Sequence, residues 1–172
     1  IAKYQEKVMV TKVKQGHSIL MNAIQLYMVQ NNCINASCLF DTKKTSEQVA
    51  AELGKVIKEA KLCKAGDDDK FCQRYYYKGN KPIKVDGVYG AGDVLFGTGR
   101  IYLPNGISFQ FVQKSQCPSI VSNSVRDENG FVIDTVESVS DTCAYIYMDV
   151  NNVEEPNQFG ADMYRYNAKF SG

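Results

Sequence analysis

The first thirty residues predict one long α-helix, and the length of this helix is the feature that most constrains the fold. The stretch contains no proline and a single glycine, Gly16. A helix of about 30 residues is about 45 Å long, which is more than a small globule needs. Residues 2–18 carry lysines and a thin apolar stripe, whereas residues 19–29 are apolar around most of the helix. We therefore expect the second half to dock on a core, and the first half to project or to be covered by another chain. Apolar residues recur at a helical period at Ile1, Tyr4, Val8, Leu20, Ala23, Ile24 and Tyr27.

A second helix is expected from Thr45 to about Leu62. Thr45 is followed three residues later by Gln48, which is the pattern of a capping box. The apolar residues that follow fall on one helical face: Val49, Ala50, Leu53, Val56, Ile57 and Ala60. The acidic run 67–69 comes next, and we expect a solvated turn there because it lacks the glycine and the distal glutamate of an EF-hand loop.

Strand patterns replace the helical period in the last part of the chain. The stretch RIYLPNGISFQFV, residues 100–112, alternates apolar and polar residues around a Pro-Asn-Gly turn, which predicts a hairpin. A turn at Asp127–Gly130 precedes a weaker strand, FVIDTV, and two further strands are expected at 143–150 and 163–170. The first of these two places four apolar residues on one face: Ala144, Ile146, Met148 and Val150.

Helices followed by antiparallel strands are typical of an α+β fold. We expect a single domain, residues 1–172, in which a long N-terminal helix (1–30) packs on an antiparallel sheet (99–172). The intervening region, 31–98, combines a helix with loops and is rich in glycine and tyrosine in its second half.

Charge is unevenly distributed, although the formal net charge is only +1. Residues 1–64 hold ten lysines and five acids, whereas residues 65–172 hold ten basic and fourteen acidic residues. This distribution argues against a uniformly basic nucleic-acid-binding surface. The uneven charge is consistent either with ordinary solvated faces or with copies of the protein that stack head to tail. No apolar run approaches the ~20 residues that cross a bilayer.

Six cysteines form an even set without the paired C-x2-C spacing of zinc sites. We expect three disulfides and an oxidising compartment; the alternative is six buried thiols in a cytosolic protein. Six cysteines allow fifteen pairings. Short local loops favour two of these pairs, which leaves the third by remainder: Cys33–Cys38, Cys63–Cys72 and Cys117–Cys143.

No sequence feature indicates an enzyme. His17 is the only histidine and lies in the basic half of the first helix, which removes most Ser–His and Cys–His arrangements. The chain has no tryptophan, and no sequence pattern positions a pair of acids for the hydrolysis of glycosides. Such an enzyme would need two carboxylates within roughly 10 Å in a cleft. Tyr75–Tyr77 could stack on a sugar or a base, although adjacent tyrosines in a strand usually belong to sheet surface and core.

Three stretches, in this order, resemble the type IV pilin-like superfamily, which comprises bacterial type IV pilins and the pseudopilins of type II secretion. IAKYQEKVMVTKVKQGHSILMNAIQLY is similar to the part of the long pilin helix that follows its membrane-embedded half, with Tyr4-Gln5 leading into a lysine-rich segment. GRIYLPNGISFQF is similar to a hairpin with a Leu-x-(Asp/Asn)-Gly turn. IYMDVNNVEEPNQFGADMYRY looks like the C-terminal pattern of an Asp-x-Asn turn, Pro-Asn, Gly-x-Asp and an aromatic strand.

The resemblance implies a ladle-shaped fold and a non-enzymatic filament subunit. It also implies a precursor with about 20 mostly apolar residues before Ile1 and a short leader that a prepilin peptidase removes. Such subunits are anchored in the inner membrane with the head in the periplasm. They then assemble with other pilin or pseudopilin subunits into homomeric or heteromeric filaments, periplasmic or extracellular, that serve secretion, adhesion, motility or DNA uptake. Six cysteines exceed the usual one or two bridges, and residues 63–98 match no part of the family pattern.

Assembly by helix packing requires an exposed apolar strip, which marks an interface rather than a core. We expect this strip at four positions of the first helix: Ile1, Tyr4, Val8 and Val13. The alternative function is a secreted, disulfide-stapled module that binds a ligand or carbohydrate through Tyr75–Tyr77. That alternative predicts a compact head with a concave aromatic face and no projecting helix.

Some pseudopilins bind calcium in the C-terminal loop, and by position the resemblance implies Asp149, Asn151 and Asp162 as calcium ligands here. Hard oxygen ligands suit calcium. The alternative, which follows from the residue types, is that Asp149 and Asn151 form Asx turns while Asp162 accepts hydrogen bonds from loop backbone. An EF-hand register is excluded, because counting from Asp149 places Glu154 where the glycine belongs.

Overall fold

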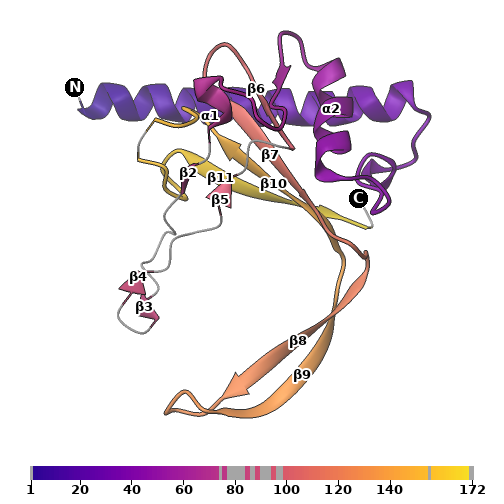
Figure 1. Ribbon diagram of the computed structural model, residues 1–172, viewed down its shortest axis with the longest axis vertical. Coiled ribbons are helices and arrows are strands. Elements are labelled where there is room, and N and C mark those ends of the chain that lie inside the picture. Colours follow the sequence, from indigo (N-terminus) through magenta and orange to yellow (C-terminus); the bar gives the residue numbers. More distant parts are fainter. Residues whose placement is uncertain are drawn as a thin grey trace.

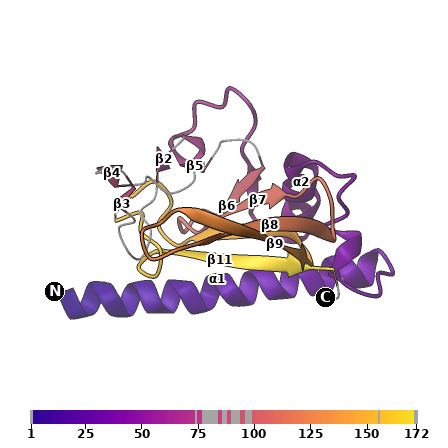
Figure 2. The ribbon, with the colours of Figure 1, turned by 90° about the horizontal axis from the view of Figure 1, so that it is seen from below.

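The computed structural model describes residues 2–73, 75–76, 84–85, 88–89, 94–95, 99–154 and 156–170. Its largest element is helix α1 (Ala2–Gln30), which follows one face of a five-stranded antiparallel sheet. The order of strands across the sheet is β1 (Lys61–Leu62), β6 (Arg100–Tyr102), β7 (Ser108–Gln113), β10 (Thr142–Asp149) and β11 (Met163–Lys169). Figure 2 shows α1 extending past the sheet at its N-terminal end.

The main core lies between the two helices and the sheet. In β10, Ile146 pairs with Phe111 of β7 and Met148 pairs with Phe109, and all four side chains are buried. The alternation expected for residues 144–150 is therefore confirmed. From α1, the buried residues Gly16, Leu20, Ala23 and Tyr27 face this layer, and their spacing of three and four residues follows one side of the helix.

Gly16 allows α1 to approach the sheet closely. A Cβ atom at this position would lie 2.6 Å from Sδ of Met148 and 3.3 Å from Cγ2 of Ile107. Ordinary contacts between such atoms are about 3.5–4.0 Å. A side chain at position 16 would therefore require Met148 to shift or the helix to move away from the sheet.

Helix α2 (Ser46–Val56) begins as expected and ends earlier than expected. Thr45 accepts a hydrogen bond from the backbone N–H of Gln48, and the Gln48 side chain accepts one from the backbone N–H of Thr45, so the capping box is confirmed. The expected end near Leu62 is wrong. Ile57 is already extended, Glu59 has a φ of 63°, and the following residues form β1 and pair with β6. Pairing with the sheet thus outweighs the helical pattern of the apolar residues.

A long hairpin leaves the globule between β7 and β10. Its strands are β8 (Ser119–Arg126) and β9 (Val132–Ser140), which pair only with each other in a two-stranded sheet. We call this hairpin the arm; Figure 1 shows it extending away from the sheet and from α1. The weak strand expected at 131–136 is part of β9, whereas β8 was not anticipated.

The remaining elements are short. Two 3-10 turns, η1 (Ala36–Cys38) and η2 (Lys70–Cys72), contain or adjoin disulfide cysteines. Two small ribbons lie in the glycine- and tyrosine-rich region: β2 (Tyr75–Tyr76) pairs with β5 (Val94–Leu95), and β3 (Lys84–Val85) pairs with β4 (Val88–Tyr89). The molecule is thus α+β, with an N-terminal helix, an antiparallel sheet and a second helix.

Three disulfides are present, and they are the pairs favoured from the sequence: Cys33–Cys38, Cys63–Cys72 and Cys117–Cys143. The first closes the loop after α1, and the second joins the segment after β1 to η2. The third connects the residues on either side of the arm, so it holds the root of the arm against β10.

Candidate functional site

The N-terminal part of α1 is the largest uncovered feature of the helix. Every residue from Ala2 to Val8 is exposed, and the first fully buried residue is Gly16. Tyr4 is 72% exposed and Val8 is 39% exposed. Large apolar side chains that are exposed together are typical of a surface that another molecule covers. This part of α1 is the segment that Figure 2 shows beyond the sheet.

The structure divides the strip that was expected for assembly. Tyr4 and Val8 lie one helical turn apart and are exposed. Val13 is half buried and packs against the core, because it lies three residues before Gly16 and seven before Leu20 on the docked side of the helix. Ile1 lies outside the described residues. In the half of the described helix before Gly16, the exposed large apolar residues are therefore Tyr4, Val8 and, on another side, Val10.

A basic row, which was not predicted from the sequence, lies next to this apolar surface. Lys3, Lys7, Val10 and Lys14 follow one another at intervals of four, three and four residues, so they share one helical face, and all four are exposed. The row is offset by one residue from Tyr4 and Val8, or about 100° around the helix. The spacing of the lysines is the signal that could have revealed it.

The C-terminal loop between β10 and β11 contains the three residues that were expected to bind calcium. Asp149 Oδ1 accepts a hydrogen bond of 2.9 Å from the backbone N–H of Asn151, which forms an Asx turn. Asp162 is fully buried, and its two carboxylate oxygens accept backbone N–H bonds from Asn157 at 2.8 Å and from Gln158 at 2.7 Å. These hydrogen bonds are the ones expected if Asp149 and Asp162 stabilise the loop backbone instead of binding calcium.

Two asparagines complete this polar loop. Asn152 and Asn157 have φ values of 58° and 48°, a left-handed conformation that asparagine tolerates better than most residues. Within the described residues, Asn152 Oδ1 and Nδ2 and Asn157 Oδ1 are buried without a hydrogen-bond partner. Calcium takes six to eight oxygen ligands, and the described part of the chain contains no group of three His, Cys, Asp or Glu residues that could hold a metal. The calcium site stays a prediction, and the observed contacts are those of loop closure.

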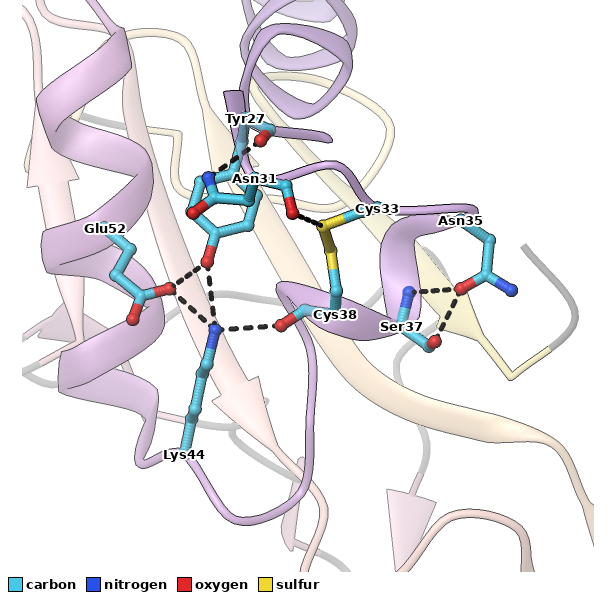
Figure 3. Close-up of a disulfide and its surroundings, with 8 residues drawn as sticks. All are labelled: Tyr27, Asn31, Cys33, Asn35, Ser37, Cys38, Lys44 and Glu52. Carbon is cyan, nitrogen blue, oxygen red and sulfur yellow. Dashed lines mark hydrogen bonds and ion pairs between the residues drawn. A yellow bond between two sulfur atoms is a disulfide. The ribbon is translucent and has the colours of Figure 1, made fainter. Parts of the chain in front are cut away.

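A polar cluster fixes the C-terminal end of α1 against α2 (Figure 3). Lys44 Nζ donates to Tyr27 Oη at 3.0 Å, to the Cys38 carbonyl at 2.8 Å and to Glu52 Oε2 at 2.7 Å, while the Tyr27 hydroxyl donates to the same Glu52 oxygen at 2.6 Å. The hydrogen bond from Lys44 Nζ to the Cys38 carbonyl therefore also connects the cluster to the Cys33–Cys38 disulfide loop.

The pKa values in this cluster describe a stable ion pair rather than a reactive group. Burial raises the pKa of the Tyr27 hydroxyl, and its bond to Glu52 raises it further. Burial alone would raise the pKa of Glu52 and lower that of Lys44. The mutual hydrogen bonds and charges outweigh burial, so the pKa of Glu52 is lowered and that of Lys44 is raised. Lys44 therefore stays protonated and is not a nucleophile.

Asp69 of the acidic run has a structural contact instead of standing free in solvent. The Tyr102 hydroxyl donates to Asp69 Oδ2 at 2.5 Å, and Asp69 Oδ1 caps η2 by accepting from the backbone N–H of Phe71. Burial, together with this bond, raises the pKa of Tyr102 to about 12. Asp67 and Asp68 are exposed, as expected for a solvated turn, whereas Asp69 is partly exposed and also links the Cys63–Cys72 loop to β6.

No catalytic constellation appears among the described residues. His17 lies on the surface of α1, where Nδ1 is 3.0 Å from Tyr166 Oη and the two rings stack. Three open pockets of about 300 to 480 Å³ have a single carboxylate among the described residues that line them, Glu52, which is already paired with Lys44. The side chains of Tyr75–Tyr77 lie outside the described residues.

Within the part of the chain that the structure describes, no helix combines the length and the apolar character that a bilayer crossing requires. Comparison with known proteins gives no match, either to a protein family, to a curated protein or to a solved structure.

Proposed function

We propose that this chain is a non-enzymatic subunit that assembles with like subunits into a pilin-like filament through the projecting part of α1. The observation that supports the proposal most directly is the exposure of residues 2–8 at the end of a 29-residue helix. A helix that served only this globule would gain nothing from the turns that lie beyond the sheet, because most helical stability in proteins comes from packing.

The arrangement of α1 on the sheet agrees with the ladle shape that the sequence resemblance implies. The second half of the helix is fixed by the Gly16 contact and by the Tyr27 cluster, so the first half has a defined direction relative to the head. A rigid stem with an apolar side is suited to packing against the stems of other copies. In this proposal an apolar segment before Ile1 holds the waiting subunit in the inner membrane, with the head in the periplasm.

The proposal is tested by photo-crosslinking in cells that express the natural gene. A crosslinking amino acid at Tyr4 should yield a ladder of covalent multimers, whereas the same amino acid at Ile34 should not, although Ile34 is 98% exposed. The double variant Tyr4→Glu/Val8→Glu should abolish filaments. Val29→Glu is the matched control, since Val29 is exposed at the docked end of the same helix.

Thermal unfolding of the purified chain shows whether a loss of filaments results from a loss of folding stability. All three substitutions are at exposed positions, so the unfolding midpoint should change little. Equal crosslinking at Tyr4 and Ile34, or normal filaments in the double variant, would contradict the proposal.

A further inference from the structure

The arm is a second surface without a partner in this chain. β8 and β9 form a two-stranded sheet on their own, and an isolated two-stranded hairpin is marginally stable at best in water. Large apolar side chains on it are nevertheless at least half exposed. They are Ile120, Phe131, Val132, Ile133, Val136 and Val139. Their exposure over both faces and the tip indicates a surface that becomes covered on assembly.

The charge of the arm restricts what can cover it. Between Ser119 and Ser140 the arm has four acids and one base, Arg126, and the guanidinium of Arg126 already donates to the Gly130 carbonyl within the turn. Pairing of two arms would bring like charges together, which is unfavourable. A basic surface with some apolar area is therefore the complementary partner.

The chain itself carries such a surface. The exposed row of Lys3, Lys7, Val10 and Lys14 on α1 is basic and contains an apolar residue. Tyr4 and Val8 lie on a different side of the helix. The arm of the same molecule extends away from α1, as Figure 1 shows. The row must therefore be reached by the arm of another copy.

We propose that the arm docks on the basic row of α1 in a second copy of this chain. The arm is long enough to cover the row: nine residues of extended strand span about 30 Å, and the row from Lys3 to Lys14 is about 16 Å long. The contact leaves Tyr4 and Val8 available for packing between helices, because they lie on another side of α1. The Cys117–Cys143 disulfide fixes the root of the arm on the central part of the sheet, so the arm has a defined direction. The inference rests on the proposed assembly of copies and adds to it a second, electrostatic contact.

The test uses a photo-crosslinking amino acid at Phe131, near the tip of the arm, in cells that express the natural gene. We expect a product of twice the subunit mass, whose digestion joins an arm peptide to a peptide from residues 2–14. The charge reversal Glu128→Lys/Glu137→Lys should reduce this product at least fivefold. The compensating reversal Lys3→Glu/Lys7→Glu, combined with the first, should restore it, which a purely structural effect would not do.

Each result has a distinct meaning. A crosslink within one subunit, a crosslink to a different protein or to another region of the chain, or the absence of any product overturns the arm contact. If multimers still form through a crosslinker at Tyr4 in that case, the proposed assembly stands without the arm. If crosslinks through Tyr4 are missing as well, both proposals fail.

Discussion

The replacement Gly16→Ala tests the close docking of α1 on the sheet. Alanine in place of glycine inside a helix ordinarily stabilises it by about 1 kcal/mol. Here the added methyl group would lie 2.6 Å from Sδ of Met148, so the two must separate by about 1 Å. Met148 is fully buried in β10, and overpacking of this kind costs about 1–3 kcal/mol. We therefore expect a net loss of about 1 kcal/mol.

Gly54→Ala in α2 is the matched control, since it makes the same change in the same type of element. A Cβ atom there would meet only Cγ2 of Ile101, at 3.3 Å, which a small adjustment relieves. We expect Gly54→Ala to be neutral or to stabilise by about 0.5 kcal/mol.

Urea and thermal unfolding under oxidising conditions measure both variants. For a domain of this size, 1 kcal/mol shifts the unfolding midpoint by about 2–4 °C. The midpoint should fall for Gly16→Ala and stay level or rise for Gly54→Ala. A rise of equal size in both variants would refute the conclusion that helix and sheet are in close contact at Gly16.

Two further predictions concern buried or partly buried carboxylates. Glu52→Gln should lower the free energy of unfolding at pH 7 by about 1–2 kcal/mol, because it removes charged hydrogen bonds to Lys44 and Tyr27. Because the pKa of Glu52 is lowered in the folded protein, its contribution to the free energy of unfolding is present above the unfolded pKa near 4.5 and is lost as the pH falls through the folded pKa. Urea unfolding of the original protein and of Glu52→Gln should therefore show a smaller difference in free energy of unfolding at pH 3 than at pH 7. An equal difference at the two pH values would contradict this. Asp162→Asn should destabilise by about 2 kcal/mol, because one oxygen that accepts a backbone N–H is replaced by a donor. We expect that loss to be equal in chelator and in millimolar calcium chloride; a loss that depends on calcium would identify an ion at the loop.

The elements with a regular burial period could be predicted from the sequence. The second half of α1 and helix α2 each bury one side, and the apolar residues at 144, 146, 148 and 150 share the face of β10 that lies in the main core, so their spacing follows the period of the element. β8 shows no such signal, because its residues are exposed or half buried along the whole strand and its sequence, SIVSNSVR, mixes serines with apolar residues on both faces. A hairpin that no other element of its own molecule covers need not show a buried face in its own sequence.

The early end of α2 and the partial burial of Val13 depend on contacts between distant parts of the chain. Ile57 and Ala60 fit a helical period, yet the chain leaves the helix to pair β1 with β6 about 40 residues later. Val13 was grouped with Tyr4 and Val8 as an apolar residue of the stem, but the point where the sheet meets α1 decides which side of the helix is covered. Spacing alone does not locate that point.

The disulfides join each cysteine to the next one along the chain, with separations of 5, 9 and 26 residues. No bridge encloses or crosses another. A chain that enters an oxidising compartment from its N-terminus can therefore complete each bridge before the first cysteine of the next pair emerges, and short loops close at a low entropic cost. In such a compartment, oxidation in the order of the chain would give these three pairs without the finished sheet and without a reshuffling step.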